Sequence, residues 1–223
     1  MEQVRTILLH RSAYMDNDLE ADALRSYLKD KGVFVVNLMS SPGAGKTTTL
    51  TKLINLMKDE VRIGVMEADI DSNVDAISIA KNTGVKSIQL HTGGMCHLDA
   101  GMTKNGLDEI DISDLDLVFL ENVGNLVCPA EFDTGASLDV MILSIPEGDD
   151  KPLKYPLVFE KSDLVIINKI DALPYFNFDL DKCINWIKQR NKNATIIPIS
   201  AKTGEGILKV KEYFINKLKT FKE

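Results

Sequence analysis

The sequence reads VFVVNLMSSPGAGKTTTL from Val33 to Leu50. Its unbroken apolar run over 33–39 predicts a buried strand, and apolar residues at helical spacing predict a helix over 47–58. Between them lies Ser-Ser-Pro-Gly-Ala-Gly-Lys-Thr, and a glycine-containing loop with Lys-Thr between a strand and a helix is typical of phosphate binding. The usual motif begins with glycine, where this chain has Ser40. A helix-capping turn would explain the serine and glycine residues, but not Gly-Lys-Thr at this spacing.

The residues of this loop have separate expected roles. Because glycine allows close approach, the backbone N–H groups of residues 43–46 would wrap the phosphates, helped by the helix N-terminus. Lys46 would bridge the outer phosphates, and the Thr47 hydroxyl would hold Mg²⁺. The predicted nucleotide-binding residues of the loop are Pro42, Gly43, Ala44, Gly45, Lys46, Thr47 and Thr48.

A second motif predicts which base is bound. A buried strand is expected to end at Asn168-Lys169-Ile170-Asp171. The Asp171 carboxylate can accept hydrogen bonds from guanine N1–H and the exocyclic amine, whereas adenine would leave it unpaired at a substantial cost. A further strand leads into Ser200-Ala201-Lys202, where a backbone N–H could reach guanine O6. These motifs together predict a site for GTP and GDP.

The overall composition favours one ordinary globular domain. The chain has 223 residues, 44% of them hydrophobic and 26% charged, and a formal net charge of −7. This charge and the lack of a basic patch argue against nucleic acid as a partner. With no long apolar stretch and no signal-peptide pattern, we expect a cytoplasmic protein without a membrane segment. Three cysteines, an odd number, argue against a disulfide framework.

Strand-like and helix-like patterns alternate along the chain. Strands are expected at 33–39, 61–67, 85–90, 115–121, 138–145, 163–168 and 194–199, and helices at 47–58, 73–82, 179–190 and 205–219. Near-continuous apolar strands are typical of a parallel sheet that is covered on both faces. We therefore predict an α/β fold of the P-loop NTPase type, an open, mostly parallel sheet of about seven strands with helices on both faces.

We expect a single domain with an N-terminal addition. Residues 1–31 would form an amphipathic leader helix that packs on a GTPase domain over 32–223. The predicted apolar stripe of this helix consists of Leu19, Ala23, Leu24, Tyr27 and Leu28.

A phosphate-loop enzyme needs a carboxylate near Thr47 to complete the shell of Mg²⁺. The strand over 115–121 ends at Glu121, three residues before Gly124, whose backbone N–H could respond to the γ-phosphate. From the loop after the strand over 61–67 we choose Asp69, with Asp71 and Asp75 as further options. Asp71 could instead cap the following helix.

The predicted catalytic residues are therefore Lys46, Thr47, Asp69 and Glu121. No glutamine follows the Glu121-x-x-Gly124 motif, where many GTPases position the attacking water. We therefore expect slow unassisted hydrolysis.

Two cysteines and one histidine predict a second metal site. Cys96 and His97 are adjacent, and thiolate and imidazole ligands suit Ni²⁺ or Zn²⁺, although a buried cysteine beside a hydrogen-bonded histidine explains the pair equally well. Cys128 lies seven residues after Glu121, on the segment expected to move with the γ-phosphate. If the three side chains share a metal, nucleotide state and metal affinity are coupled.

One chain supplies two thiolates and one imidazole, one ligand short of a four-coordinate shell, and a twofold homodimer could supply the rest. Cys183, with apolar neighbours at helical spacing, is expected to pack in the core. His10 and His91 have no partner at ligand spacing and receive no role.

The motifs of this chain resemble those of the nickel-incorporation GTPases of [NiFe]-hydrogenase maturation, the HypB family, over nearly the whole length. The most specific pieces are Thr92-Gly93-Gly94-Met95-Cys96-His97-Leu98-Asp99-Ala100 and Glu121-Asn122-Val123-Gly124-Asn125-Leu126-Val127-Cys128-Pro129. Pro146-Glu147-Gly148-Asp149-Asp150 adds to them.

This resemblance implies a P-loop GTPase that dimerises with GTP, with a nickel or zinc site at the interface from Cys96, His97 and Cys128. It implies delivery of nickel to a hydrogenase large-subunit precursor, with a nickel-delivery partner protein. It also suggests that Lys154 contacts the nucleotide of the partner. The sequence lacks the cysteine-rich and histidine-rich metal motifs of some members, so tight metal storage is not expected.

Three other functions fit the sequence less well. A urease-type nickel GTPase would carry a Cys-Pro-His motif, which this chain lacks. A P-loop kinase of a small metabolite would leave Asn168, Lys169, Asp171 and the Ser-Ala-Lys turn without a purpose. A binding module with a degenerate nucleotide site is disfavoured by the intact Lys46, Thr47 and Glu121.

Overall fold

The computed structural model describes residues 10–69 and 74–223, and in this part of the chain seven strands form one sheet. The strands are β1 (Phe34–Ser40), β2 (Ile63–Asp69), β3 (Lys86–His91), β4 (Leu117–Glu121), β5 (Leu138–Ser144), β6 (Leu164–Asn168) and β7 (Thr195–Pro198). They run in the order β3-β2-β4-β1-β5-β6-β7, and every neighbouring pair is parallel. The sheet is therefore parallel throughout, as expected for strands with almost no exposed residues.

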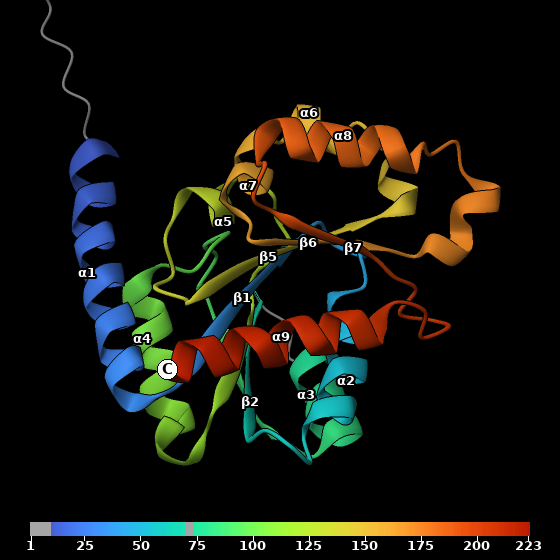
Figure 1. The fold of residues 1–223 in the computed structure, drawn as a ribbon. Coiled ribbons are helices and arrows are strands. Elements are labelled where there is room, and N and C mark those ends of the chain that lie inside the picture. The colour runs from blue at the N-terminus through green and yellow to red at the C-terminus, as the bar shows by residue number, and fades with distance from the viewer. Residues whose placement is uncertain (1–9, 70–73) are drawn as a thin grey trace, which may run out of the picture.

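Helices cover both faces of the sheet. They are α1 (His10–Lys31), α2 (Lys46–Met57), α3 (Val74–Thr83), α4 (Ala100–Ile110), α5 (Cys128–Glu131), α6 (Lys151–Lys154), α7 (Pro156–Lys161), α8 (Leu180–Arg190) and α9 (Ile207–Lys222). Short 3₁₀ turns η1 (Ile112–Asp114), η2 (Ile145–Glu147) and η3 (Ile170–Tyr175) connect some of them. Figure 1 shows α8 above and α9 below the part of the sheet formed by β5, β6 and β7.

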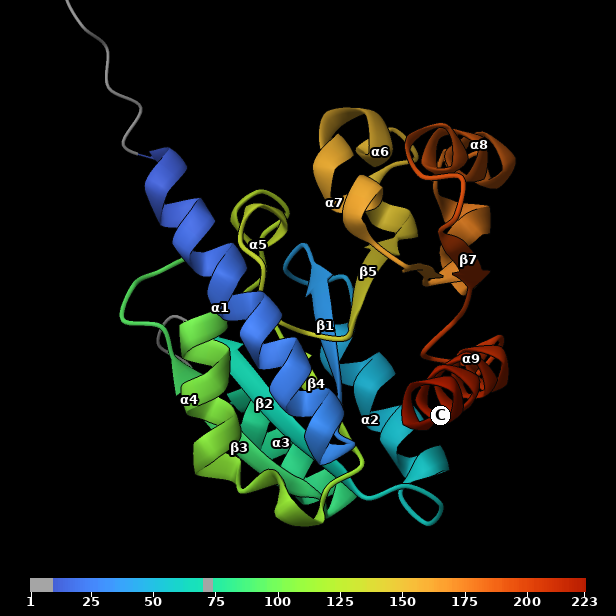
Figure 2. The same cartoon turned by 60° about the vertical axis from the view of Figure 1, so that its left-hand side comes forward.

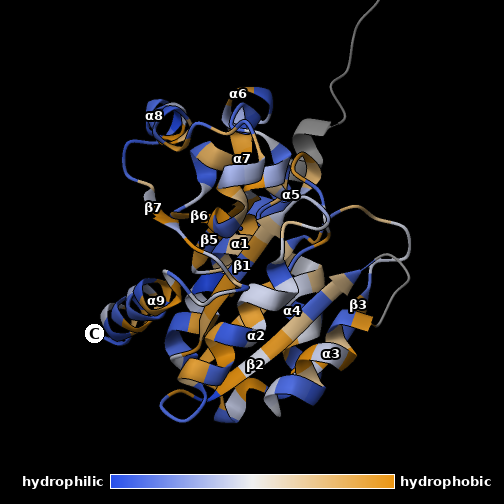
Figure 3. Ribbon diagram, turned by 90° about the vertical axis from the view of Figure 1, so that its right-hand side faces the viewer, coloured by the Kyte–Doolittle hydropathy of each residue, from blue (hydrophilic) through white to orange (hydrophobic). Residues whose placement is uncertain are grey.

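Alternate residues of the central strand β1 point to opposite faces and enter different apolar clusters. Val36 and Leu38 pack in one continuous cluster with residues of α2, α3 and α9. Val35 packs with α1 and α4, and Met39 packs with α7 and α8 in a third cluster. Figure 3 shows the hydrophobic residues gathered in the strands and on the inner sides of the helices.

A polar chain separates the two clusters on the second face. Asn122, just after β4, donates from Nδ2 to Oδ1 of Asn37 in β1 (3.0 Å). Asn37 donates in turn to Oδ1 of Asp139 in β5 (2.8 Å). Asn37 and Asn122 are buried, and each hydrogen bond satisfies a polar group that would be costly to leave unpaired.

The N-terminal helix differs in detail from its prediction. The predicted apolar stripe includes Leu19 and Ala23, but both are exposed, Leu19 by 70%. The buried stripe is Ala21, Leu24 and Leu28, whose spacing of three and four residues places them on one helix face. Figure 2 shows α1 running along α4. The division into a leader over 1–31 and a GTPase domain over 32–223 stays a prediction.

Helix α4 is absent from the sequence-based prediction, because its glycine, threonine and asparagine residues weaken the helical signal. Its start is fixed by Asp99, whose carboxylate accepts a hydrogen bond from the N–H of Met102 (2.8 Å). The seven predicted strands and the helices predicted over 47–58, 73–82, 179–190 and 205–219 lie within a few residues of their observed positions. Asn73, the first residue of one predicted helix, lies outside the described residues.

Candidate nucleotide and metal sites

A cavity of about 610 Å³ opens at the carboxyl edge of the sheet. The loop over 42–48 forms one wall, residues 67–69 and 121–124 form others, and Asp75 and Lys169 complete the lining. Parallel strands bring their carboxyl ends to one edge, which is where such folds bind ligands. The residues predicted to hold phosphate and Mg²⁺ therefore meet in one place.

The phosphate-binding loop has the backbone shape that its glycines permit. Gly43 and Gly45 have φ values of 75° and 96°, in the left-handed region. An ideal Cβ on Gly45 would lie 2.5 Å from Nδ2 of Asn168, so no side chain fits there. Ser40, which replaces the usual glycine, ends β1 and is buried, and its Oγ accepts a hydrogen bond from Nζ of Lys46 (3.0 Å).

Thr47 and Glu121 are in contact, as the magnesium prediction requires. The Thr47 hydroxyl donates to Oε1 of Glu121 (2.9 Å), and Glu121 is only 2% exposed. Among the described residues, none provides a partner for Oε2 of Glu121 or for Oε2 of Glu67. Burial raises the pKa of each of these carboxyls to about 7. Two buried carboxylates with unsatisfied oxygens suit a divalent cation, which would neutralise them.

Glu67 is a site residue that sequence reasoning missed. Carboxylate oxygens of Glu67, Asp75 and Glu121 all lie within 4.8 Å of one another. Glu67 and Glu121 are paired across β2 and β4, and this pairing follows from the strand order, which the sequence does not reveal. Asp69 lines the same cavity, and its role in holding Mg²⁺ stays a prediction. Asp71 lies outside the described residues.

Gly124 lies against the phosphate-binding loop. A Cβ added to Gly124 would be 3.0 Å from Cγ of Pro42 and 3.3 Å from its backbone nitrogen. The segment after β4 is therefore packed on the loop that would surround the phosphates. Because the two segments are in close contact, a shift of either one would displace the other.

The guanine motif holds its loops together through Asn168. Nδ2 of Asn168 donates to the carbonyl oxygen of Ala44 (2.9 Å), and Oδ1 accepts from the N–H of Ala201 (3.0 Å). Lys169, at a φ of 64°, donates from Nζ to the carbonyl oxygen of Gly43 (2.6 Å). The phosphate loop and the Ser-Ala-Lys turn are thus tied to the end of β6.

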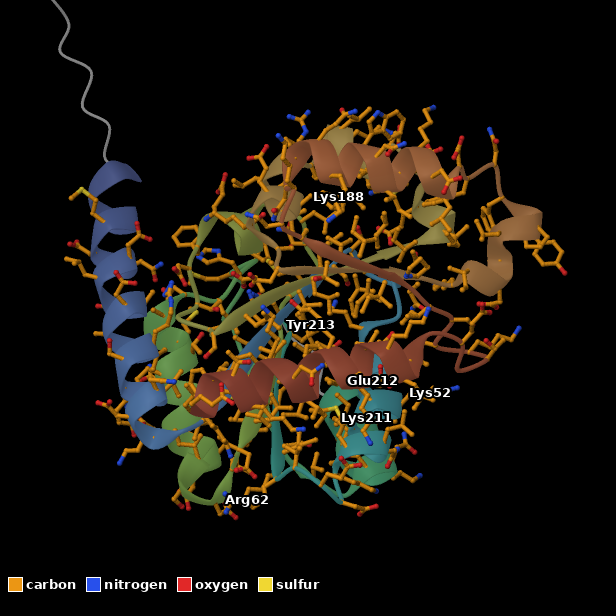
Figure 4. All side chains as sticks on the ribbon, viewed as in Figure 1. Lys52, Arg62, Lys188, Lys211, Glu212 and Tyr213 are labelled. Atoms are coloured by element: carbon orange, nitrogen blue, oxygen red, sulfur yellow. The ribbon has the colours of Figure 1, made fainter. Side chains whose placement is uncertain are left out.

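Asp171 is positioned by the neighbouring turn. The Ser200 hydroxyl donates to Oδ1 of Asp171 (2.6 Å), and Ser200 itself is buried. Lys52 of α2 donates from Nζ to the carbonyl oxygen of Lys202 (3.0 Å), and Figure 4 labels Lys52 where α2 meets the loop before α9. Half-buried Asp171 keeps one oxygen for a further donor.

Cys96, His97 and Cys128 also come together. Sγ of Cys96 and Sγ of Cys128 are 2.7 Å apart, and Sγ of Cys96 is 3.9 Å from Nδ1 of His97. All three are half-buried, and one donor atom of each lies within 4.8 Å of the others. Burial lowers the pKa of His97, which favours the neutral, metal-binding imidazole. The hydrogen bond with Cys96 raises the pKa of Cys128, so a metal would have to displace that proton.

The two sites are joined by eight consecutive residues over 121–128. Within them, the N–H of Asn125 donates to the Val123 carbonyl (2.8 Å), and Oδ1 of Asn125 accepts from the N–H of Val127 (2.9 Å). Phe132, just beyond, stacks on the His97 ring at 3.8 Å between centroids. The segment that carries Glu121 and Gly124 therefore also carries one thiol and supports the imidazole.

Three other predicted side chains are placed as follows. Cys183 is fully buried in an apolar cluster, which confirms core packing, and burial raises its pKa to about 12. His91 ends β3 with an exposed side chain. Lys154 lies on α6 and pairs with Asp150 at 2.6 Å, and its contact with a partner's nucleotide stays a prediction.

The parallel sheet, the phosphate-binding loop at the end of β1 and the carboxylate beside Thr47 define a P-loop nucleotide-binding protein. In the described part of the chain, no helix is long and apolar enough to cross a membrane.

Comparison with known proteins gives the particular family. Residues 34–198 match the family described as CobW/HypB/UreG, nucleotide-binding domain. The hydrogenase maturation factor HypB of Escherichia coli is 44% identical over 207 residues, which are 93% of this chain and 71% of that protein. The hydrogenase/urease maturation factor HypB of Helicobacter hepaticus is 45% identical over 90% of this chain and 84% of its own length.

A crystal structure of HypB from Helicobacter pylori in complex with nickel superposes with a TM-score of 0.87. It is 37% identical in sequence and matches 92% of this chain and 96% of that one. The chain belongs to the HypB group of the CobW/HypB/UreG family. This confirms the family resemblance that the motifs indicated, and the P-loop NTPase fold.

Proposed function

We propose that this protein is a slowly hydrolysing GTPase that carries nickel for the maturation of a [NiFe]-hydrogenase. The observation that carries the proposal is the cluster of Cys96, His97 and Cys128, connected to Glu121 by one short segment. The nickel complex of HypB from Helicobacter pylori supports the choice of metal. The hydrogenase maturation factors among the relatives support the client.

Most of the groups proposed to bind the nucleotide are already arranged around the cavity. The N–H groups of the loop over 43–46 would face the phosphates, Lys46 would exchange its bond with Ser40 for a phosphate oxygen, and Asp171 would accept from guanine. Bound Mg²⁺ would supply charge neutralisation at the β- and γ-phosphates, held by Thr47 and Glu121 with Glu67, Asp69 or Asp75. Because no glutamine follows the Glu121-x-x-Gly124 motif, hydrolysis would be slow.

The metal would be bound by the two thiolates and the neutral imidazole. Because Gly124 packs on Pro42, occupation of the γ-phosphate position would shift the segment that ends at Cys128. The set of three ligands leaves one position for a ligand from a second copy or from a partner protein. We propose that GTP closes a homodimer around this cluster and that hydrolysis opens it, releasing nickel toward the hydrogenase precursor.

The test is a Ni²⁺ titration by calorimetry of the protein without nucleotide, with GDP and with a non-hydrolysable GTP analogue. Light scattering measures the molar mass in each state. We expect the affinity and stoichiometry to depend on the nucleotide, and Cys128→Ala to abolish this dependence. Cys183→Ala, which removes a thiol that is not one of the proposed ligands, is the matched control. Identical Ni²⁺ binding in all three states would contradict the proposal.

A nucleotide panel separates the alternatives. GTP-selective slow hydrolysis supports the metal carrier, ATP-dependent phosphorylation of a metabolite supports a kinase, and no turnover supports a binding module. The hydrogenase/urease maturation factor of Helicobacter hepaticus makes urease a second client to test. Nickel transfer to apo-urease and to the apo-hydrogenase subunit, measured side by side, would decide between the clients.

A further inference from the structure

Asn17 is an asparagine that is buried in the middle of a helix. It lies inside α1 and is only 8% exposed, although asparagine is a poor helix former and its amide is costly to bury without partners. Its side chain is directed away from its own helix. Nδ2 donates to the carbonyl oxygen of Asp133 (3.0 Å), and Oδ1 accepts from the N–H of Ala100 (3.0 Å).

These two partners belong to the two segments that carry the thiols. Ala100 begins α4, three residues after His97. Asp133 follows α5 and lies five residues after Cys128. A single amide therefore joins the Cys96-His97 segment to the Cys128 segment. No hydrogen bond of the described backbone connects the two segments directly at these positions.

Further contacts fix α1 against the same two segments. The Arg25 guanidinium forms two hydrogen bonds with the Asp133 carboxylate, and that carboxylate also accepts from the N–H of Gly135 (2.8 Å). A Cβ on Gly135 would lie 2.8 Å from Leu24, so the loop after α5 lies directly on α1. Leu98, next to His97, is buried in the same apolar cluster as Leu24.

Without Asn17, the two segments would lose their common polar anchor. The Ala100 N–H is one of the first N–H groups of α4, which have no partner within the helix. The Asp133 carbonyl would also be left without its donor. The remaining contacts of Arg25 and Leu24 with these segments would hold them less closely, so the separation of Cys96 and Cys128 would be less tightly set.

We propose that Asn17 is a positioning residue of the metal site, which holds the Cys96-His97 and Cys128 segments at the separation that thiolate binding needs. This inference rests on the metal site of the proposed function. Groups that orient metal ligands from outside typically change affinity by about 10- to 100-fold when they are removed. Asn17 does not contact the ligand side chains themselves, but it contacts both of the segments that carry them.

The test compares Co²⁺ and Ni²⁺ binding by the wild-type protein, Asn17→Ala, Asn17→Asp and Leu28→Val. Co²⁺ is a suitable probe because its visible and near-ultraviolet absorption reports thiolate ligation and coordination geometry. Asn17→Asp retains an acceptor for Ala100 but places a carboxylate oxygen against the carbonyl oxygen of Asp133, so it opposes the second connection while the first is kept. Leu28→Val removes one buried methylene at the far end of α1 and controls for loss of stability alone.

We expect Asn17→Ala to lower metal affinity by about 10-fold or more, with weakened thiolate bands, while affinity for a GTP analogue stays within about 2-fold. Asn17→Asp should also lower metal affinity, because its carboxylate repels the carbonyl oxygen of Asp133. Leu28→Val should shift the thermal midpoint comparably and leave metal affinity unchanged.

Wild-type affinity in both Asn17 variants, or an equal loss in Leu28→Val, would overturn this inference alone. If Cys128→Ala binds metal as well as the wild-type protein does, the proposed metal carrier is overturned, and the inference falls with it. The two failures are therefore distinguishable.

Discussion

The nucleotide site and the metal cluster lie at the same edge of the sheet but are built differently. The nucleotide site is assembled from strand ends, and Asn168 already ties Ala44 and Ala201 together. The metal cluster lies on two connecting segments, with Gly93 and Gly94 in open surroundings before Cys96. Its second half begins the short helix α5, and a third element, α1, joins the two halves.

This difference suggests a division of roles. A site that must recognise GTP against a large excess of other nucleotides gains from rigid, preformed geometry. A site that must accept and release a metal gains from segments that can shift, because release requires an alternative arrangement of its ligands. The packing of Gly124 on Pro42 is the point where the rigid part meets the adjustable part.

The largest effect is expected at Asp171, the residue proposed to recognise the base. Asp171→Asn replaces an acceptor of two hydrogen bonds by a group that donates, so GTP affinity should fall by about 10²- to 10⁴-fold. Xanthosine triphosphate, which has a carbonyl where guanine has its amine, should bind better to the variant than GTP does. Competition binding with both nucleotides measures this, and GTP affinity within about 10-fold of wild type would contradict a preformed guanine site.

A smaller effect is expected in the phosphate loop. Gly45→Ala must place a Cβ 2.5 Å from Nδ2 of Asn168 at a φ of 96°. We expect a loss of GTP affinity of roughly 100-fold, because the loop must shift away from its phosphate-binding shape. Metal affinity in the absence of nucleotide should be retained. Fluorescent-nucleotide and Ni²⁺ titrations together test whether the two sites are separable.

The next prediction concerns the half-buried carboxyl of Asp139, which shares a cavity with residues just after Cys128. Asp139 lines a cavity of about 150 Å³ with Pro129 and Phe132, and burial raises its pKa to about 6. The folded state therefore binds this proton more tightly than the unfolded state, whose pKa is about 3.9. The contribution of Asp139 to stability should fall as the pH rises from about 4 to 6.

Asp139→Asn keeps an oxygen acceptor for Asn37 and cannot ionise. At pH 7.5 the variant should be more stable than wild type by roughly 1–3 kcal/mol, and at pH 4 the difference should vanish. Thermal unfolding across this range is the measurement. A difference that does not depend on pH would mean that the carboxyl is not the titrating group.

The smallest effect is expected at Gly94, a glycine of the metal segment with nearly the same φ as Gly45. Gly94 has a φ of 94°, but an added Cβ would meet nothing within 4 Å. Gly94→Ala should therefore cost only about 1–2 kcal/mol of stability, from the backbone conformation alone. Nucleotide and Ni²⁺ affinities should change by less than about 3-fold. A loss as large as that of Gly45→Ala would show that the metal segment is as rigid as the nucleotide site.

Much of the nucleotide site could be predicted from the sequence because it consists of short motifs, each of which is local in the chain. The loop over 40–47 is a local motif with a fixed backbone shape, and Asn168 to Asp171 follow a recognisable strand. Glu67 escaped prediction because its role depends on β2 lying beside β4, which no local pattern reveals.

Asn17 escaped prediction for the same reason. Its partners lie 83 and 116 residues away in the sequence. Leu19 shows a different error. Its apolar side chain predicts a place on the buried face, although its position around the helix axis places it on the exposed side. The cluster of Cys96, His97 and Cys128 could be predicted as a group, but its meeting point depends on the order of β3, β2 and β4.

The polar chain from Asn122 through Asn37 to Asp139 has a consequence for local opening of the protein. One face of the sheet is covered by a continuous apolar cluster. On the other face, these polar side chains separate the apolar residues into two clusters. Units that share no apolar contacts can unfold separately. In hydrogen–deuterium exchange, the amides of α7 and α8 should therefore exchange as one group and those of α4 as another. The amides of β1 and β4 should exchange last.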